Sequence, residues 1–167
     1  MGATIISDRL IGSLANHCEE STLFSHGFTY SGHPAAAVAA LKTMEIIEKE
    51  KILEHVRQIT PYFQERLHAL GEKYDIIGDA RGIGLIGCLE GNVSSGLSAS
   101  ETLSIDYKFG DLINEATEKR GLLVRPIINM CVFSPPLIIT RNQVDEMFDL
   151  LDDALKEVQN KLQIEKT

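Results

Sequence analysis

One stretch fixes where a helix must begin in the N-terminal part of this chain. The nine residues from His26 to Pro34, HGFTYSGHP, carry small and hydroxyl-bearing side chains and run directly into alanine-rich sequence. Proline suits the first turn of a helix, because its fixed φ is helical and its missing N–H would have no partner there. Alanine is the strongest helix former. We therefore expect a loop over residues 26–33 and a helix from Pro34 to about residue 50.

The same loop is a candidate anion site. A helix N-terminus presents unpaired backbone N–H groups and the positive end of the helix dipole. Thr29 and Ser31 place two hydroxyl groups just ahead of it, with Gly27 and Gly32 beside them. This combination is typical of a phosphate-binding cradle. An ordinary loop that only starts a helix fits the same residues, and the loop alone leaves both interpretations open.

The spacing of apolar residues predicts the remaining elements. Helical periodicity indicates helices over residues 51–70 and 102–119, and a third after Thr140, which forms a capping-box pattern with Gln143. Pro61 is expected to kink or break the first of these helices and Gly71 to end it. Strands are expected over residues 3–6, as one glycine-bearing strand over residues 76–90, and over 122–127 and 130–133 around a tight turn at Asn129.

This order of elements predicts an α+β fold, in which a mostly antiparallel sheet of three to four strands has helices on one face. The net charge of −8 over 167 residues argues against a nucleic-acid partner. No apolar stretch reaches the roughly 20 residues of a membrane helix, and no secretory leader is visible. The three cysteines, Cys18, Cys88 and Cys131, form neither a metal-ligand spacing nor a disulfide framework, so we expect a reducing, cytoplasmic location.

Arg125 is the second candidate site residue. Its guanidinium lies in an apolar strand next to Pro126, where a charge needs a partner. A planar guanidinium bonds both oxygens of a carboxylate at once, which predicts carboxylate recognition. An edge-strand arginine that pairs with a surface acid is the alternative. Arg81 is interpreted as an ion-pair residue, and His55 and Asp152 as surface residues of helices.

Three long stretches carry a resemblance to a known family. They are GATIISDR at residues 2–9, HGFTYSGHPAAAVAALKTMEIIE at 26–48 and VRPIINMCVFSPPLIITRNQVDEMFDLLDDAL at 124–155. Together they resemble the C-terminal part of class III (omega) aminotransferases, which use pyridoxal 5'-phosphate. The resemblance implies the small C-terminal domain of a fold-type I enzyme over residues 34–167 and a remnant of the large cofactor-binding domain over residues 1–33.

The resemblance also implies a chemistry. An amino group would pass from an amine or omega-amino acid to a keto acid such as pyruvate. Thr29 would reach across a dimer interface to the phosphate of the partner's cofactor, and Arg125 would hold the carboxylate of the substrate. The family's catalytic lysine lies ahead of the GATIISDR stretch and is absent from this sequence. We therefore expect the chain to be inactive without a large domain, and to act as a homodimer or with a companion chain. A non-catalytic fragment that only folds or dimerises is the alternative.

Overall fold

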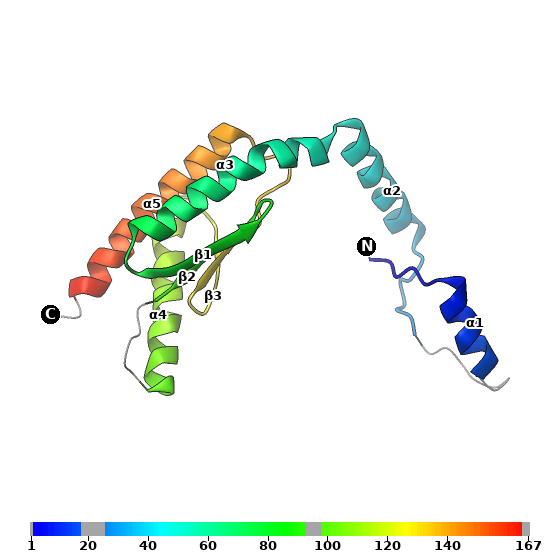
Figure 1. Cartoon of the computed structure of the whole chain (residues 1–167), viewed down its shortest axis with the longest axis horizontal. Coiled ribbons are helices and arrows are strands. Elements are labelled where there is room, and N and C mark those ends of the chain that lie inside the picture. Colours follow the sequence, from blue (N-terminus) through cyan, green and yellow to red (C-terminus); the bar gives the residue numbers. More distant parts are fainter. Residues whose placement is uncertain (1, 18–25, 93–97, 165–167) are drawn as a thin grey trace. The chain divides into compact units, whose positions relative to one another are not determined.

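The computed structural model describes residues 2–17, 26–92 and 98–164 (Figure 1). The chain divides into two compact units, Met1–Glu50 and Lys51–Thr167, each of which is described by itself. Among these described residues, the first unit contains two helices, and the second contains three helices and a sheet.

The long helix of the first unit begins at Pro34, as the sequence predicts. Helix α1 spans Asp8–His17, and helix α2 spans Pro34–Lys49 with proline in its first turn. Helix α2 has no buried residue, and Val38, Leu41 and Met44 expose more than half of their surface. The strand expected over residues 3–6 is wrong, because these residues form no strand in the structure. A short β-branched run needs a neighbouring strand to pair with, and the first unit offers none among its described residues.

The second unit is the α+β layer that the sequence predicts. Its elements are α3 (Ile52–Lys73), β1 (Ile77–Ile83), β2 (Ile86–Gly91), α4 (Ala99–Glu118), β3 (Arg125–Ile127), β4 (Met130–Phe133) and α5 (Arg141–Ile164). The four strands pair antiparallel throughout, in the order β1-β2-β4-β3. Helix α3 packs on β1 and β2, α4 packs on β3 and β4, and α5 packs against both helices.

The helices cover one face of the sheet. A Cβ on Gly87 would meet Leu67 of α3, and a Cβ on Gly91 would meet Phe109 of α4, so this side of β2 lies directly against both helices. Side chains alternate between the two faces of a strand. The intervening residue on the same face, Leu89, is fully buried. The prediction of helices on one face of an antiparallel sheet is therefore confirmed.

Among the residues that the structure describes, the core lies entirely within the second unit. The ring centroids of Phe63 in α3 and Phe148 in α5 are 5.3 Å apart, in the edge-to-face arrangement that aromatic pairs favour. Phe133 of β4 meets the same Phe148 ring at 6.4 Å and joins the sheet to the helices. The buried cluster extends from Ile59 to Leu162. All three helices and the inner face of the sheet therefore share one apolar centre.

One predicted strand is a hairpin. Residues 76–90 form β1 and β2, which turn at Gly84 with φ of +60°. Apolar alternation continues through a short turn without a visible break, so the pattern predicts one strand where there are two. Glycine takes positive φ without steric cost, and this is the physical signal that marks the turn.

Helix α3 is longer than predicted. It passes through Pro61 without a break and continues beyond Gly71 to Lys73. Proline removes the N–H that would bond the carbonyl of Arg57, but both residues are exposed, so water can bond that carbonyl instead. The last turn is held from outside the helix, because Lys73 donates to Asp152 of α5 at 2.6 Å. The expectation that Asp152 is simply solvated is therefore wrong.

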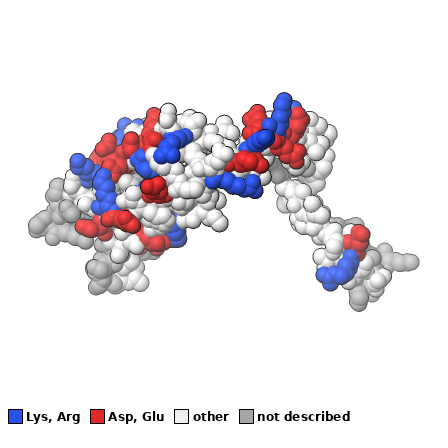
Figure 2. All heavy atoms as spheres, turned by 45° about the horizontal axis from the view of Figure 1, so that its top comes forward, with Lys and Arg blue, Asp and Glu red and all other residues white. Residues whose placement is uncertain are grey.

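Polar contacts also hold α5 against α3. Arg66 of α3 donates to Asp145 at 2.5 Å and to Asp149 at 2.6 Å, both on α5. His55, expected at the surface, is only partly exposed, and its Nε2 lies 2.9 Å from the carbonyl of Ile139. Figure 2 shows acidic and basic side chains interspersed over the face that it draws. The hydrogen bonds from Arg66 to Asp145 and Asp149 fix the position of α3 relative to α5.

Short-range interactions determine the start of α5 and the turn of the β3–β4 hairpin. The predicted capping box is confirmed, because Gln143 N–H donates to Thr140 Oγ1 at 3.3 Å and Thr140 N–H donates to Gln143 Oε1 at 2.9 Å. The predicted turn around Asn129 is also present, but the positive φ of +59° falls on Ile128. Strand β3 forms one edge of the sheet and contains Pro126.

Candidate functional site

The loop before α2 is a tight turn in which the Thr29 hydroxyl makes no hydrogen bond to any described residue. Residues 29–32 form the turn, and Gly32 takes φ of +71°. Ser31 stabilises it twice, because its Oγ accepts the Phe28 N–H at 2.9 Å and its N–H donates to the Phe28 carbonyl at 2.9 Å. Thr29 is exposed, and its hydroxyl makes no hydrogen bond within the described residues. Of the two hydroxyls that the sequence singles out, Ser31 holds the loop and Thr29 remains available.

The helix that follows this turn begins without a side-chain cap. His33 occupies the N-cap position, and no side chain bonds the first N–H groups of α2. The imidazole of His33 instead lies edge-to-face against the ring of Tyr30, with centroids 5.9 Å apart. An uncapped N-terminus retains backbone donors and the positive end of its dipole. The Thr29 hydroxyl and these donors have the chemical character that a phosphate group requires.

Arg125 begins β3, at the edge of the sheet. Strand pairing aligns it with Val132 of β4, Cys88 of β2 and Arg81 of β1 in one cross-strand row. This row lies on the face of the sheet opposite Leu89 and the helices, because its members alternate with the buried residues. The structure thus places the guanidinium at an exposed edge, on the face that the helices of this unit leave uncovered.

The two arginines of this row differ in their partners. Arg81 forms ion pairs with Asp79 and with Glu90, the latter at 2.6 Å, and its hydrogen bonds to these carboxylates raise the pKa of its guanidinium. The interpretation of Arg81 as an ion-pair residue is confirmed. Arg125 has no acidic partner and no hydrogen bond from its side chain within the described part of the chain. The charge of Arg125 is therefore available to an anion, whereas that of Arg81 is already neutralised.

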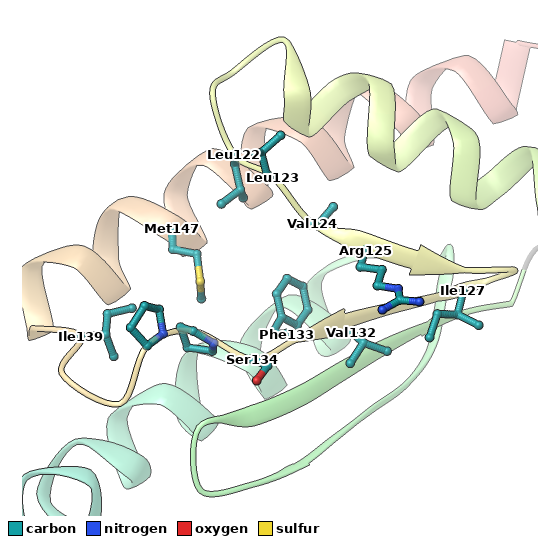
Figure 3. Close-up of a pocket in the computed structure, with 12 residues that line it drawn as sticks. Leu122, Leu123, Val124, Arg125, Ile127, Val132, Phe133, Ser134, Ile139 and Met147 are labelled. Atoms are coloured by element: carbon teal, nitrogen blue, oxygen red, sulfur yellow. The ribbon is translucent and has the colours of Figure 1, made fainter. Parts of the chain in front are cut away.

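Arg125 also lines a groove of about 740 Å³ whose other lining side chains are apolar apart from Ser134 (Figure 3). The walls come from three separate segments, the run before and into β3, the end of β4 with the loop that follows it to Ile139, and Met147 of α5. Sequence reasoning missed this groove. No local pattern joins residues so far apart in the chain, and only the packing of α5 beside the hairpin brings them together.

The two predicted site residues lie in different units, Thr29 in the first and Arg125 in the second. The cysteines in the described residues offer no chemistry of their own. Burial raises the pKa of the Cys131 thiol to about 12, and it also raises that of Cys88. Over residues 2–17, 26–92 and 98–164, no group of His, Cys, Asp and Glu could hold a metal ion. Within the same ranges, none of the helices has the length and apolarity of a membrane span.

Comparison with known proteins gives consistent matches. The family model described as aminotransferase class-III matches residues 5–155. A probable gamma-aminobutyrate transaminase 4 of Oryza sativa subsp. japonica is 32% identical over 162 residues, which is 97% of this chain and 33% of the rice protein. This chain therefore spans about a third of the length of that relative.

Solved structures match at a similar level. A structure described as a transaminase with L-ala has a TM-score of 0.81 and 32% identity, over 94% of this chain and 36% of the other. A thermostable (S)-enantioselective omega-transaminase from Thermomicrobium roseum has a TM-score of 0.75 and 32% identity, over 92% of this chain and 32% of the other. The matches cover nearly all of this chain and about a third of each of those structures.

Proposed function

Because the chain belongs to the class III aminotransferases, a family that depends on pyridoxal 5'-phosphate, we propose that it supplies the C-terminal part of an omega-type aminotransferase. The reaction is the transfer of an amino group from an amine or omega-amino acid to a keto acid such as pyruvate. A large domain, which these 167 residues do not include, supplies the reactive lysine. The assembly is a homodimer or a pairing with a companion chain. Residues 1–33 are assigned to the large domain and 34–167 to the small one, although the compact second unit of the structure begins at Lys51.

Thr29 fits a role in holding the cofactor phosphate. Its hydroxyl is exposed and unbonded within the described residues, and it precedes a helix N-terminus that no side chain caps. When bound, pyridoxal 5'-phosphate supplies an electron sink to the reacting carbon. The contribution of Thr29 is to donate a hydrogen bond to a phosphate oxygen and so to fix the position of the cofactor, as the family resemblance implies.

Arg125 carries the proposal on the substrate side. The single observation behind it is that this guanidinium lacks an acidic partner within the described residues, whereas Arg81 in the same row has two. A planar guanidinium binds both oxygens of a carboxylate and orients the group attached to it. Arg125 therefore positions the keto acid, and it takes no part in proton transfer.

A hybrid enzyme tests this function. This chain replaces the matching third of the Thermomicrobium roseum omega-transaminase, and alanine formation from pyruvate and an amine is measured. We expect activity, with kcat/KM for pyruvate reduced about 10²-fold in Arg125→Met, because the hydrogen bonds and charge of a carboxylate contact are worth about 1.5–3 kcal/mol. Thr29→Val is expected to weaken cofactor affinity. Arg57→Met, at an exposed position of α3, is the matched control.

A second measurement tests whether this chain carries a reactive lysine of its own. The chain alone is mixed with pyridoxal 5'-phosphate and reduced with borohydride, and lysine adducts are located by mass spectrometry. We expect no stable adduct at one specific lysine, because the described lysines lie at the surface without the burial that activates such a residue. An inactive hybrid that folds and binds cofactor would favour the non-catalytic fragment instead.

A cytoplasmic location stays a prediction.

A further inference from the structure

The groove beside Arg125 has one charged end. Leu123, Val132, Phe133, Pro135 and Met147 contribute apolar surface to its walls (Figure 3). Arg125 is the one charged residue among those that line it, and Ser134 is the one other residue there with a polar side chain. Its volume of about 740 Å³ lies within the usual range of small-molecule sites. The groove therefore combines an apolar channel with a single fixed cation.

This arrangement selects a class of ligand by charge and by surface. A carboxylate would pair with the unpartnered guanidinium of Arg125, and an apolar chain attached to it would be removed from water along the walls. Leu123 alone exposes 82% of its surface, so apolar area remains to be covered. A second carboxylate farther along the ligand would meet no cation in the lining and would lose its hydration.

We propose that this groove binds the apolar side chain of a 2-oxo monocarboxylate while Arg125 binds its carboxylate, so that the acceptor is a keto acid with a long hydrocarbon tail. The inference rests on the proposed function for its identification of the ligand as an acceptor. It goes beyond that function in assigning the tail to the small domain, to residues of β4, α5 and the segment before β3. Leu123 and Met147 then determine specificity for tail length.

Binding to the 167-residue chain tests the inference without cofactor or turnover. Pyruvate, 2-oxooctanoate and 2-octanone are titrated, with affinity from calorimetry and location from amide chemical shifts. The first two share a head group, and the last two share a tail. We expect 2-oxooctanoate to bind at least about 30-fold more tightly than pyruvate, since each buried methylene adds to affinity. The shifts should fall on residues 122–136 and on Met147.

Two variants and two matched controls separate the head from the tail. Arg125→Met should weaken the binding of 2-oxooctanoate about tenfold or more and leave the binding of 2-octanone unchanged. Leu123→Asp lies at an exposed position and should not affect folding. It should lower the affinity for 2-oxooctanoate to that for pyruvate. The controls are Arg57→Met and Leu53→Asp, both at exposed positions of α3 outside the groove lining, and neither should change binding.

Several outcomes would overturn the inference. These are equal affinity for pyruvate and 2-oxooctanoate, binding of neither, shifts outside the groove, or unchanged binding in Leu123→Asp. The result is distinguishable from the test of the proposed function. A hybrid enzyme that aminates pyruvate while the groove binds no 2-oxooctanoate removes only this inference. Selective binding in the groove together with an inactive, cofactor-loaded hybrid removes only the proposed function.

Discussion

At the scale of single residues, one glycine controls how closely the β3–β4 turn approaches helix α4. A Cβ on Gly110 would collide with the backbone carbonyl of Ile128, which is itself held at a positive φ of +59°. Positive φ is unusual for a β-branched residue and is maintained only by its surroundings. The glycine and the strained isoleucine are thus two parts of one contact, which sets the position of β3 and hence of Arg125.

Gly110→Ala should therefore destabilise the chain although alanine favours helix. The gain in helix propensity of about 1 kcal/mol is at best balanced by the overpacking against backbone, which costs about 1–3 kcal/mol, so we expect a net loss of stability of up to about 2 kcal/mol. Urea unfolding followed by circular dichroism measures the difference, with Asn114→Ala at an exposed position of the same helix as control. An increase in stability equal to that of the control would contradict the contact.

At the scale of elements, an ion-pair network joins the end of α4 to α5. Arg120 lies 2.9 Å and Lys161 2.8 Å from carboxylate oxygens of Glu157. Hydrogen bonds from Lys161 and Arg120 lower the pKa of Glu157 to about 2, below the value of about 4.3 for an unfolded chain. The carboxylate of Glu157 therefore binds a proton less readily in the folded state than in the unfolded state.

The sign of the pH dependence follows from that shift. A carboxylate whose pKa is lower in the folded state stabilises it above the unfolded pKa, and the contribution is lost as pH falls from about 4.5 towards 2. Glu157→Gln should lower the free energy of unfolding at pH 7 by up to about 1 kcal/mol, because the pair is partly exposed. The difference between variant and parent should vanish near pH 2. Glu146→Gln, at an exposed position of the same helix, should leave the pH profile unchanged.

Elements with local signals were predictable, and elements defined by remote contacts were not. Pro34 and the Thr140–Gln143 capping box each mark the start of a helix in the sequence, and the structure has a helix start at both places. The hairpin at Gly84 and the end of α3 were missed, because one depends on a turn inside an unbroken apolar alternation and the other on Asp152 in α5. Arg125 could be singled out as a charge in an apolar strand, but its lack of a partner is visible only in three dimensions.

At the scale of the whole molecule, the chain carries its stability in the second unit. Every member of the buried cluster lies after Lys51, and α2 buries no residue. Burial of apolar surface is the main source of folding free energy. The described residues of the first unit therefore contribute little to cooperative unfolding within this chain.

Residues 51–167 expressed alone should accordingly fold as the full chain does. We expect the same urea midpoint and the same dependence of unfolding free energy on urea, because that slope follows the surface exposed on unfolding. A loss of more than about a fifth of the slope would show that the first unit is part of the cooperative core, since the extrapolation itself is uncertain by about 10–15%.

Pro126 has a consequence for how copies of this chain meet. The two-residue turn makes Ile127 and Met130 the closing pair of the hairpin, and alternation then directs the backbone nitrogen of Pro126 away from β4. That outward position would otherwise offer an N–H to a foreign strand, and proline has none to offer. This border of the sheet is therefore a poor template for fibril growth.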